Sequence, residues 1–283
     1  MSRRAASVAL TALILLLTAG YAFGQLPGQT NGIPQFGEFG DPARFAPEEW
    51  PDRKLATCRL MYRSNRQEAN GAGWRTDYPW AEINLMTRLS ELTKTLVSTG
   101  DRQRPNAWVV RLTDDTLFDC PYTVASDVGT MELTELEAER LRLYLLKGGF
   151  LWVDDFWGSA AWAQWLREIS KVLPPSEYPI EDVRLGDPIF RTMFDVHRVP
   201  QITSIRVWRS VGGKTTSERG SDSQEAHLRA IRDKQGRIMV VMTHNTDVAD
   251  SWEREGEDPA FFYQFSPDGY ALGINVLLYA LTH

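Results

Sequence analysis

The chain has 283 residues with 37 acidic and 31 basic side chains, which gives a formal net charge of −6 at pH 7. A net negative chain lacks the basic surface that binding to phosphate backbones requires, so nucleic acid is excluded as a partner. The length is sufficient for one large α/β domain, and two cysteines are too few for a scaffold held by disulfides.

The first 24 residues have the pattern of a secretory signal peptide. Arg3 and Arg4 precede an apolar run over 8–17, and Ala22-Phe23-Gly24 comes before Gln25. The apolar run is shorter than the ~20 residues of a membrane span, and no later segment is long and uncharged enough to be one. We therefore expect an exported protein, periplasmic or secreted, without a transmembrane span once the signal is removed. Retention of the segment as an anchor stays an alternative.

Residues 25–53 are rich in Gly, Pro and Phe and have no periodicity, which predicts an extended arm. The folded domain is expected over 54–283, with a first strand at 55–62. Cys58 lies inside the apolar pattern of this strand and is interpreted as a small core residue. An exported chain can join it to Cys120, but the sequence does not give the separation of the two Cα atoms.

Strands and helices are predicted to alternate through the middle of the chain. Asp77 and Pro79 begin a helix, and four leucines at helical spacing are expected to face inward: Leu85, Leu89, Leu92 and Leu96. Further strands are predicted at 108–112, 122–125 and 150–153, with a capping box from Thr134 to Glu137 that begins the helix before the last of them. Strand, helix and strand units of this length cross over right-handed, which predicts a doubly wound, mostly parallel α/β sheet.

The last third of the chain is predicted to contain two helices and three strands. A helix is expected over 160–173 and a strand over 202–208, followed by an exposed loop over 211–225. The runs 227–231 and 237–243 flank a turn and predict a hairpin. A closing helix is expected over 268–281, with Leu272, Asn275, Val276, Tyr279 and Ala280 facing inward.

The stretch from Gly148 to Gly158 is the most informative part of the sequence. It joins a helix stop, a buried strand and the acidic pair Asp154 and Asp155, followed by Trp157. Ligands of open parallel sheets bind beyond the carboxyl ends of the strands, which is where these side chains are expected. The structural alternative is that Asp155 caps the next helix and that Trp157 belongs to the core.

Polar residues follow the other strands as well. If the strand ends converge, one histidine and seven acids approach each other: Asp77, Asp114, Asp127, Asp154, Asp155, His244, Asp247 and Asp250. Clustered carboxylates repel, so such a group binds a cation, pairs with arginine or keeps a proton. No cofactor and no set of metal ligands is predicted, although Ca²⁺ or Mg²⁺ would suit these oxygens better than zinc. The alternative is that the aspartates only form turns and helix caps.

No nucleophile is predicted. The strand 122–125 is followed by Ser126-Asp127-Val128-Gly129, which has neither a cysteine nor the flanking glycines of a nucleophile elbow, and Cys120 comes before that strand. Covalent acyl chemistry therefore has little support.

Several blocks of the sequence occur together in one known family. They are Arg63-Ser64-Asn65, Thr76-Asp77-Tyr78-Pro79, the run 144–158, His244-Asn245 with Asp250-Ser251-Trp252-Glu253, and Gly273-Ile274-Asn275-Val276 with the residues 279–283. These blocks resemble a bacterial family called domain of unknown function 4159, over about 54–283. The resemblance implies a class I glutamine-amidotransferase-like, or flavodoxin-like, fold. It implies no established activity, and it suggests a role at the cell envelope.

Two functional hypotheses follow. The first is a domain without a nucleophile that binds a small molecule, a glycan or an envelope protein partner at the carboxyl ends of the strands. Its predicted ligand-binding residues are Arg63, Asn65, Asp77, Trp157, Asn245, Asp247, Asp250 and Trp252. The alternative is a hydrolase, cation-assisted or not, in which Asp154 or Asp155 is the general base and His244 the acid. Its substrate would be a glycan or another envelope molecule, and tryptophans beside carboxylates would suit sugar rings.

Overall fold

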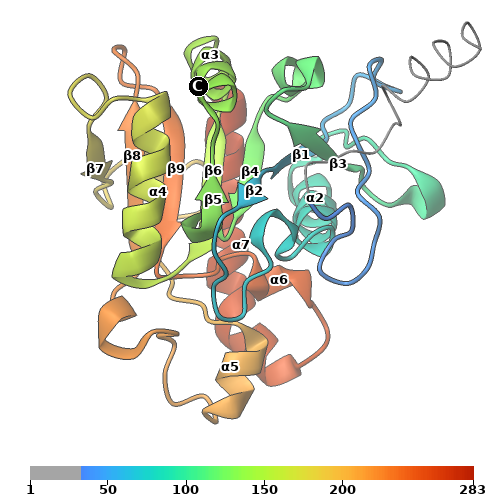
Figure 1. Cartoon of the computed structure of the whole chain (residues 1–283). Coiled ribbons are helices and arrows are strands. Elements are labelled where there is room, and N and C mark those ends of the chain that lie inside the picture. The colour runs from blue at the N-terminus through green and yellow to red at the C-terminus, as the bar shows by residue number, and fades with distance from the viewer. Residues whose placement is uncertain (1–32) are drawn as a thin grey trace, which may run out of the picture. The chain divides into compact units, whose positions relative to one another are not determined.

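A seven-stranded sheet forms the centre of residues 33–283, the part of the chain that this computed structural model describes (Figure 1). In chain order its strands are β1 (Thr57–Met61), β3 (Ala107–Arg111), β4 (Thr123–Ser126), β6 (Leu151–Phe156), β7 (Ile180–Asp182), β8 (His227–Arg232) and β9 (Ile238–His244). Their spatial order is β3-β1-β4-β6-β9-β8-β7, and the first five are parallel. The two remaining strands pair antiparallel. The predicted doubly wound, mostly parallel α/β class is confirmed.

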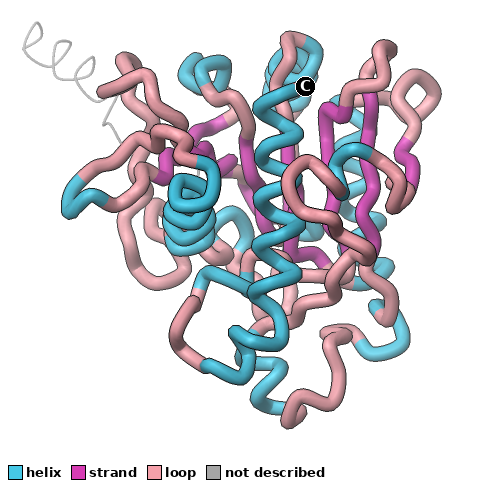
Figure 2. The backbone as a smooth tube through the Cα atoms, turned by 180° about the vertical axis from the view of Figure 1, so that it is seen from behind, coloured by secondary structure: helices cyan, strands magenta, loops and turns pink. Residues whose placement is uncertain are grey.

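Helices cover both faces of this sheet. They are α2 (Trp80–Thr93), α3 (Glu135–Leu146), α4 (Gly158–Val172), α5 (Ile205–Ser210), α6 (Asp250–Glu253) and α7 (Pro259–Thr282). In Figure 1, α3 and α4 lie in front of the sheet, and the view from behind in Figure 2 shows α2 and α7 on the opposite face. One large core cluster of the described residues fills the space between the sheet and this second pair of helices, with Leu85, Trp152, Val241 and Leu272 among its buried members. No helix within residues 33–283 combines the length and the apolar character needed to cross a membrane.

The described part of the N-terminal arm pairs with the edge strand of the sheet. The predicted signal peptide over 1–24 lies outside the described residues, whereas residues 35–283 form one compact unit. The arm runs beside β3, where the amide of Val109 donates to the carbonyl oxygen of Arg44 (2.7 Å) and the amide of Ala46 donates to that of Val109 (3.0 Å). The arm therefore pairs with a strand edge that would otherwise be exposed. A small separate sheet pairs β2 (Arg63–Ser64) with β5 (Met131–Glu132).

The two cysteines form a disulfide between Cys58 and Cys120, with their Cα atoms 6.1 Å apart. Cys58 lies in the middle of β1, and Cys120 comes at the end of the turn before β4, the neighbouring strand. Both residues are buried, which agrees with the interpretation of Cys58 as a core residue. The bridge joins the turn before β4 to β1 across 62 residues of sequence.

Several predicted elements have different bounds. Leu92 lies in the last turn of α2 and is 43% exposed, so it does not face inward as predicted. Leu96 is 72% exposed because α2 ends at Thr93 and Lys94 takes a left-handed conformation. Leucine spacing alone does not mark this helix end. The predicted strand over 202–208 is wrong, because the Ser204 hydroxyl accepts from the amide of Val207 and begins α5 instead. The closing helix begins at Pro259, nine residues earlier than predicted, and continues through Pro267.

The carboxyl ends of the parallel strands share one edge of the sheet, the lower edge in Figure 1, beside α5 and α6. From β1 the chain passes through α2 to β3 on one side, whereas from β4 it passes through α3 to β6 on the other side. The direction of winding therefore changes between β1 and β4. Ligands of doubly wound sheets bind at such a point, just beyond the strand ends.

Candidate functional site

A pocket rich in acidic side chains lies at this edge of the sheet, and we call it the carboxylate pocket. Its nine acids are Glu38, Glu68, Asp77, Asp127, Asp155, Glu218, Asp247, Asp250 and Glu253, and its three arginines are Arg206, Arg219 and Arg254. The acids come from segments that are far apart in sequence and that meet because the parallel strands end together. The free space between the side chains is about 20 Å³, enough for about one water molecule or one ion.

The neighbouring acids Asp154 and Asp155 at the end of β6 have different roles. Oδ1 of Asp154 accepts from the Thr243 hydroxyl (2.6 Å) and Oδ2 accepts from the amide of Ala249 (3.0 Å), so both oxygens have donors. Asp155 takes a left-handed conformation with φ of 53°, its side chain lines the pocket, and its Oδ1 accepts from the indole of Trp157 (2.9 Å). Asp154 therefore fastens the loop that leads to α6, and Asp155 contributes to the pocket.

Asp127 follows β4 and also has a left-handed backbone, with φ of 54°. Its amide donates to the carbonyl oxygens of Asp154 (3.1 Å) and Asp155 (3.0 Å), which places the ends of β4 and β6 together. Its Oδ2 accepts from the amide of Gly73 (2.8 Å). The loop can approach this closely because Gly71 has no side chain, since a Cβ there would lie 2.6 Å from Cγ of Asp127.

Asp77 lies in the turn that precedes α2, with φ of 65°. The Ser126 hydroxyl donates to its Oδ2 (3.4 Å), and the same hydroxyl accepts from the guanidinium of Arg59 (2.6 Å). Arg59 is fully buried and is paired with Glu82. A buried ion pair therefore lies directly behind Asp77.

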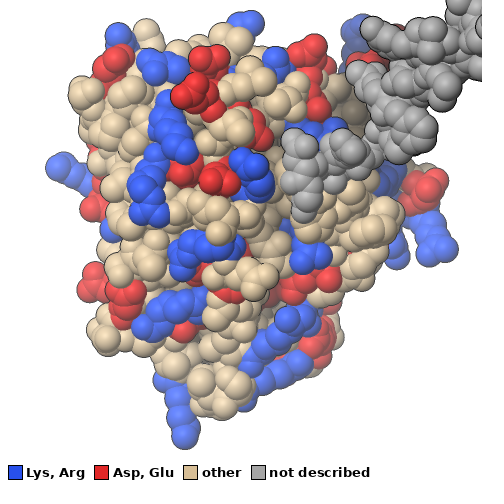
Figure 3. Space-filling model, in the orientation of Figure 1, with Lys and Arg blue, Asp and Glu red and all other residues tan. Residues whose placement is uncertain are grey.

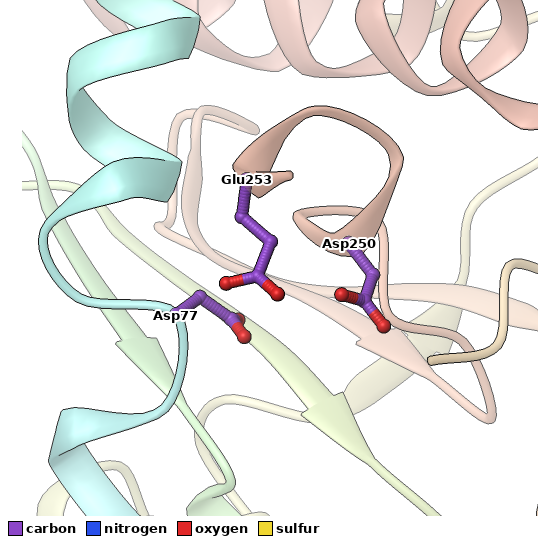
Figure 4. Close-up of side chains that lie close together, drawn as sticks. All are labelled: Asp77, Asp250 and Glu253. Carbon is purple, nitrogen blue, oxygen red and sulfur yellow. The ribbon is translucent and has the colours of Figure 1, made fainter. Parts of the chain in front are cut away.

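The short helix α6 supplies two more acids, Asp250 and Glu253. A separation of three residues puts both on the same side of one helical turn, and Figure 4 shows their carboxylates pointing toward that of Asp77. Oδ1 of Asp247 accepts from the amide of Asp250 (3.0 Å) at the start of this turn. Helix α7 can lie against α6 because Gly273 leaves room for the ring of Trp252, where a Cβ would lie 2.6 Å from the ring.

Burial and mutual repulsion favour the neutral forms of these acids. Burial raises the pKa of Asp77, Asp155, Asp247 and Asp250 well above the ordinary aspartate value, and neighbouring carboxylates raise each of them further. Burial likewise raises the pKa of Asp127 to about 7. Of the pocket arginines, Arg254 pairs with Glu253, and Arg219 pairs with Glu68 and Glu218. A bound cation is the other way to compensate the negative charge of these carboxylates.

One family model matches most of the chain. Residues 59–281 match the model of the family described as domain of unknown function (DUF4159). The chain belongs to this family. Its description states no activity, and among proteins with curated descriptions none matches the chain with significant similarity.

The DUF4159 domain brings five of the predicted site residues into the carboxylate pocket: Asp77, Asp155, Trp157, Asp247 and Asp250. Trp157 is only 3% exposed, so its ring supports Asp155 and offers no open face to a sugar. Asp154 is buried next to the pocket and does not line it. The predicted convergence is therefore present for five of the seven strand-end acids, Asp77, Asp127, Asp155, Asp247 and Asp250. Asp114 is not among them, because it stays at the end of β3, where its Oδ2 accepts from the amide of Arg111 (2.9 Å).

Four of the predicted ligand-binding residues lie outside the pocket of the DUF4159 domain. Arg63 is on the small sheet, where it pairs with Glu132 (3.1 Å), and Asn65 is exposed next to it. The amide side chain of Asn245 accepts from the backbone N–H of Gly158 and donates to the carbonyl of Glu225, which fixes two loops. Trp252 is buried and donates to the carbonyl of Ala81.

His244 also points away from the carboxylate pocket. It follows Thr243 in β9, and consecutive strand residues face opposite sides of a sheet. Thr243 reaches Asp154, whereas the ring of His244 lies 5.1 Å from that of Trp162 in α4 and contacts Arg229 and the carbonyl of Gly158. The hydrolase hypothesis stays a prediction, and its histidine would have to leave these contacts to act in the pocket.

Five acids of the pocket were not predicted as site residues: Glu38, Glu68, Asp127, Glu218 and Glu253. Asp127 was among the strand-end acids but was not assigned a role. Glu253 could have been found from its spacing of three residues from Asp250. Glu218 lies in the segment predicted as an exposed loop, yet its side chain is only 3% exposed and accepts from the amide of Ser204 (2.7 Å) and the hydroxyl of Thr203 (3.0 Å). No local pattern indicates that role.

Proposed function

We propose that this DUF4159 domain is an exported binding domain without a nucleophile. In this proposal the carboxylate pocket holds a positively charged group of an envelope ligand or partner. The observation that carries it is the composition of the pocket, in which nine acids face three arginines at the carboxyl ends of the strands. Such an excess of negative charge attracts cations and repels anionic substrates.

The hydroxyl groups of the pocket support binding over covalent catalysis. Among the described residues that line it, hydroxyls belong to Thr76 and Ser204. Thr76 donates to the carbonyl of Gly73 (2.9 Å), and Ser204 accepts from the amide of Val207 (3.2 Å) as the cap of α5. Neither hydroxyl is hydrogen-bonded to a general base, which an activated nucleophile needs.

Two features support export. The N-terminal pattern over 1–24 is that of a signal peptide. The disulfide between Cys58 and Cys120 is the kind of bond that persists in oxidising compartments and is rare in the cytosol. The surface also argues against nucleic acid as a partner. Basic and acidic side chains are interspersed over the face drawn in Figure 3, whereas a nucleic-acid binder has a continuous basic area.

The proposal is tested with ligands that differ only in charge. Oligomers of glucosamine and of N-acetylglucosamine share a sugar scaffold, but only the first carries ammonium groups. We expect the full-length protein to bind the glucosamine oligomers in isothermal titration calorimetry, with an affinity that falls as salt rises. Cell fractionation should place the protein in the periplasm or the medium.

Matched variants separate the pocket from the rest of the acidic surface. Asp155→Asn removes one negative charge inside the pocket, and Glu132→Gln removes one on the small sheet. The first should weaken binding of the glucosamine oligomers and the second should leave it unchanged. Equal binding of both oligomers, or retention of the protein in the cytoplasm, would contradict the proposal.

A further inference from the structure

We infer that the carboxylate pocket binds one hard divalent cation, Ca²⁺ in preference to Mg²⁺, through Asp77, Asp155, Asp247, Asp250 and Glu253. The inference goes beyond the proposed function, since a metal ion in the carboxylate pocket does not require a charged envelope ligand. The five side chains come from the turn before α2, the end of β6, the loop after β9 and α6.

The first observation is the geometry of the acids. They form two overlapping groups that share Asp77: Asp77 with Asp250 and Glu253, and Asp77 with Asp155 and Asp247. In each group, one carboxylate oxygen from each residue lies within 4.8 Å of the others. Oxygens on opposite sides of a Ca²⁺ ion are about 4.6–5.2 Å apart, twice the usual Ca–O distance. Within each group of three, the oxygens therefore already have separations that a Ca²⁺ coordination shell allows.

The second observation is independent of the first and concerns unsatisfied oxygens. Asp250 is 4% exposed and Glu253 is 6% exposed. Within the described residues, Oδ2 of Asp250 and Oε2 of Glu253 accept from no N–H group and no hydroxyl, and the neighbour of the Asp250 carboxyl group is that of Glu253. Figure 4 shows both carboxylates directed at Asp77. A buried carboxylate oxygen without a donor is costly, and a cation between these side chains would satisfy both oxygens.

The other oxygens of the site are held by protein donors. Oδ1 of Asp155 accepts from Trp157, Oδ1 of Asp247 accepts from the amide of Asp250, and Oε1 of Glu253 accepts from Arg254 (2.8 Å). A donor on one oxygen of a carboxylate orients the second oxygen, as outer partners do in metal sites. The pattern leaves one oxygen on each of these acids available to a ligand.

The donor set identifies the class of cation. All five side chains offer oxygen, and His244 lies on the other side of the sheet, so the nitrogen and sulfur ligands that zinc prefers are missing from the described pocket. Ca²⁺ accepts six to eight oxygens in flexible geometry, whereas Mg²⁺ keeps several waters and takes about one or two carboxylates. Five carboxylates on four segments therefore favour Ca²⁺.

Direct titration of the full-length protein tests the inference. We expect saturable binding of Ca²⁺ by calorimetry at a stoichiometry of one, with a dissociation constant of about 10⁻³ M or lower, and weaker binding of Mg²⁺. Asp250→Asn and Glu253→Gln should each weaken Ca²⁺ binding at least about tenfold, because even lost outer partners of a metal site cost that much. Glu132→Gln, which removes an acid from the Arg63 ion pair outside the pocket, should bind Ca²⁺ like the wild type.

Thermal unfolding provides a readout that a purely structural role would not produce. In EDTA, Asp250→Asn should have a higher Tm than the wild type, because a neutral amide replaces a buried carboxyl group that is costly to ionise beside other acids, and Glu253→Gln should lose little stability. In excess Ca²⁺ the wild type should have the highest Tm of the three, since only the wild type gains stability by binding. A wild type with the same Tm in EDTA and in Ca²⁺, and without saturable heat up to about 10 mM Ca²⁺, would overturn the inference.

The two proposals fail in different ways. Binding of the glucosamine oligomers in EDTA without any binding of Ca²⁺ would overturn only the cation site. Binding of Ca²⁺ without any binding of either oligomer would keep the cation site and would count against the envelope ligand. A variant that does not fold is replaced by Asp247→Asn, which removes a ligand from the other group of acids.

Discussion

The hydroxyl of Thr243 donates to Oδ1 of Asp154 at 2.6 Å, and the amide of Ala249 donates to Oδ2 of the same side chain at 3.0 Å. Asp154 therefore joins β6, β9 and the loop before α6. We expect Asp154→Ala to lower the free energy of unfolding by about 2–4 kcal/mol, because two buried donors lose a charged acceptor. Urea unfolding measures the change.

The neighbouring residue gives the control for that prediction. Asp155→Asn keeps the shape of a side chain that lines the pocket and removes a repelling charge, so it should cost far less stability than Asp154→Ala in EDTA. Equal losses for the two variants would show that the division of roles between these adjacent acids is incorrect.

Reduction of the disulfide should also lower stability. Cys58 and Cys120 are separated by 62 residues, and a loop of that length corresponds to about 4 kcal/mol from restriction of the unfolded chain. The urea midpoint of the wild type should fall when dithiothreitol is present. The double variant Cys58→Ala, Cys120→Ala should unfold near the reduced midpoint and should not respond to dithiothreitol. A wild-type midpoint that is the same with and without the reductant would contradict the prediction.

The pH dependence of stability should reveal the burial of His244. Burial, assisted by the nearby charges of Arg229 and His227, lowers the pKa of His244 to about 4, although the Gly158 carbonyl and Asp222 oppose the shift. Between the unfolded pKa of 6.5 and the folded value, the unfolded chain binds more protons, so the stability contributed by the neutral ring is complete above pH 6.5 and is lost as pH falls toward 4.

The measurement is a comparison of the wild type with His244→Gln in urea unfolding from pH 7 to pH 4.5. The difference in the free energy of unfolding should shrink by up to about 1.4 kcal/mol per pH unit below pH 6.5. Carboxylates and His227 are common to both proteins and largely cancel in the difference. A difference that stays constant over this range would show that His244 titrates normally in the folded protein.

The packing of α7 against α6 should affect the affinity of the pocket for Ca²⁺, although Gly273 does not line the pocket. A Cβ on Gly273 would lie 2.6 Å from the ring of Trp252, so Gly273→Ala should push α6 outward and cost about 1–3 kcal/mol. Because α6 carries Asp250 and Glu253, Ca²⁺ affinity should fall in parallel. Gly236→Ala is a control for loss of a glycine with positive φ in an open turn, and it should leave Ca²⁺ affinity unchanged. Unaltered Ca²⁺ affinity in Gly273→Ala would contradict this coupling.

Local patterns were sufficient for the sheet and for most helices. The apolar run at 150–153 predicts the central strand, and the Thr134 to Glu137 capping box predicts the start of α3, because both signals act within a few residues. The inward side of α7 was predicted correctly at Asn275, which accepts from the amides of Met193 and Phe194. The errors at Leu96 and at 202–208 occur where a single capping residue overrides the apolar pattern.

The candidate site was harder to predict, because it depends on the direction of each side chain as well as on its position in the chain. The sequence places Asp154, Asp155 and His244 at neighbouring strand ends, but the face that each side chain takes follows from the irregular pairing between Val153 and Phe156 in β6 and from the alternation along β9. Glu218 illustrates a second difficulty. Its burial depends on Thr203 and Ser204, about fifteen residues away in a segment without regular structure.

Three acids of the pocket, Asp77, Asp127 and Asp155, hold left-handed backbone conformations that residues other than glycine seldom adopt. The surrounding strands impose these conformations, so the directions of the three carboxylates are set when the domain folds. Binding of a ligand in the pocket therefore requires little further ordering of the chain, and preorganisation of this kind strengthens binding without adding any contact.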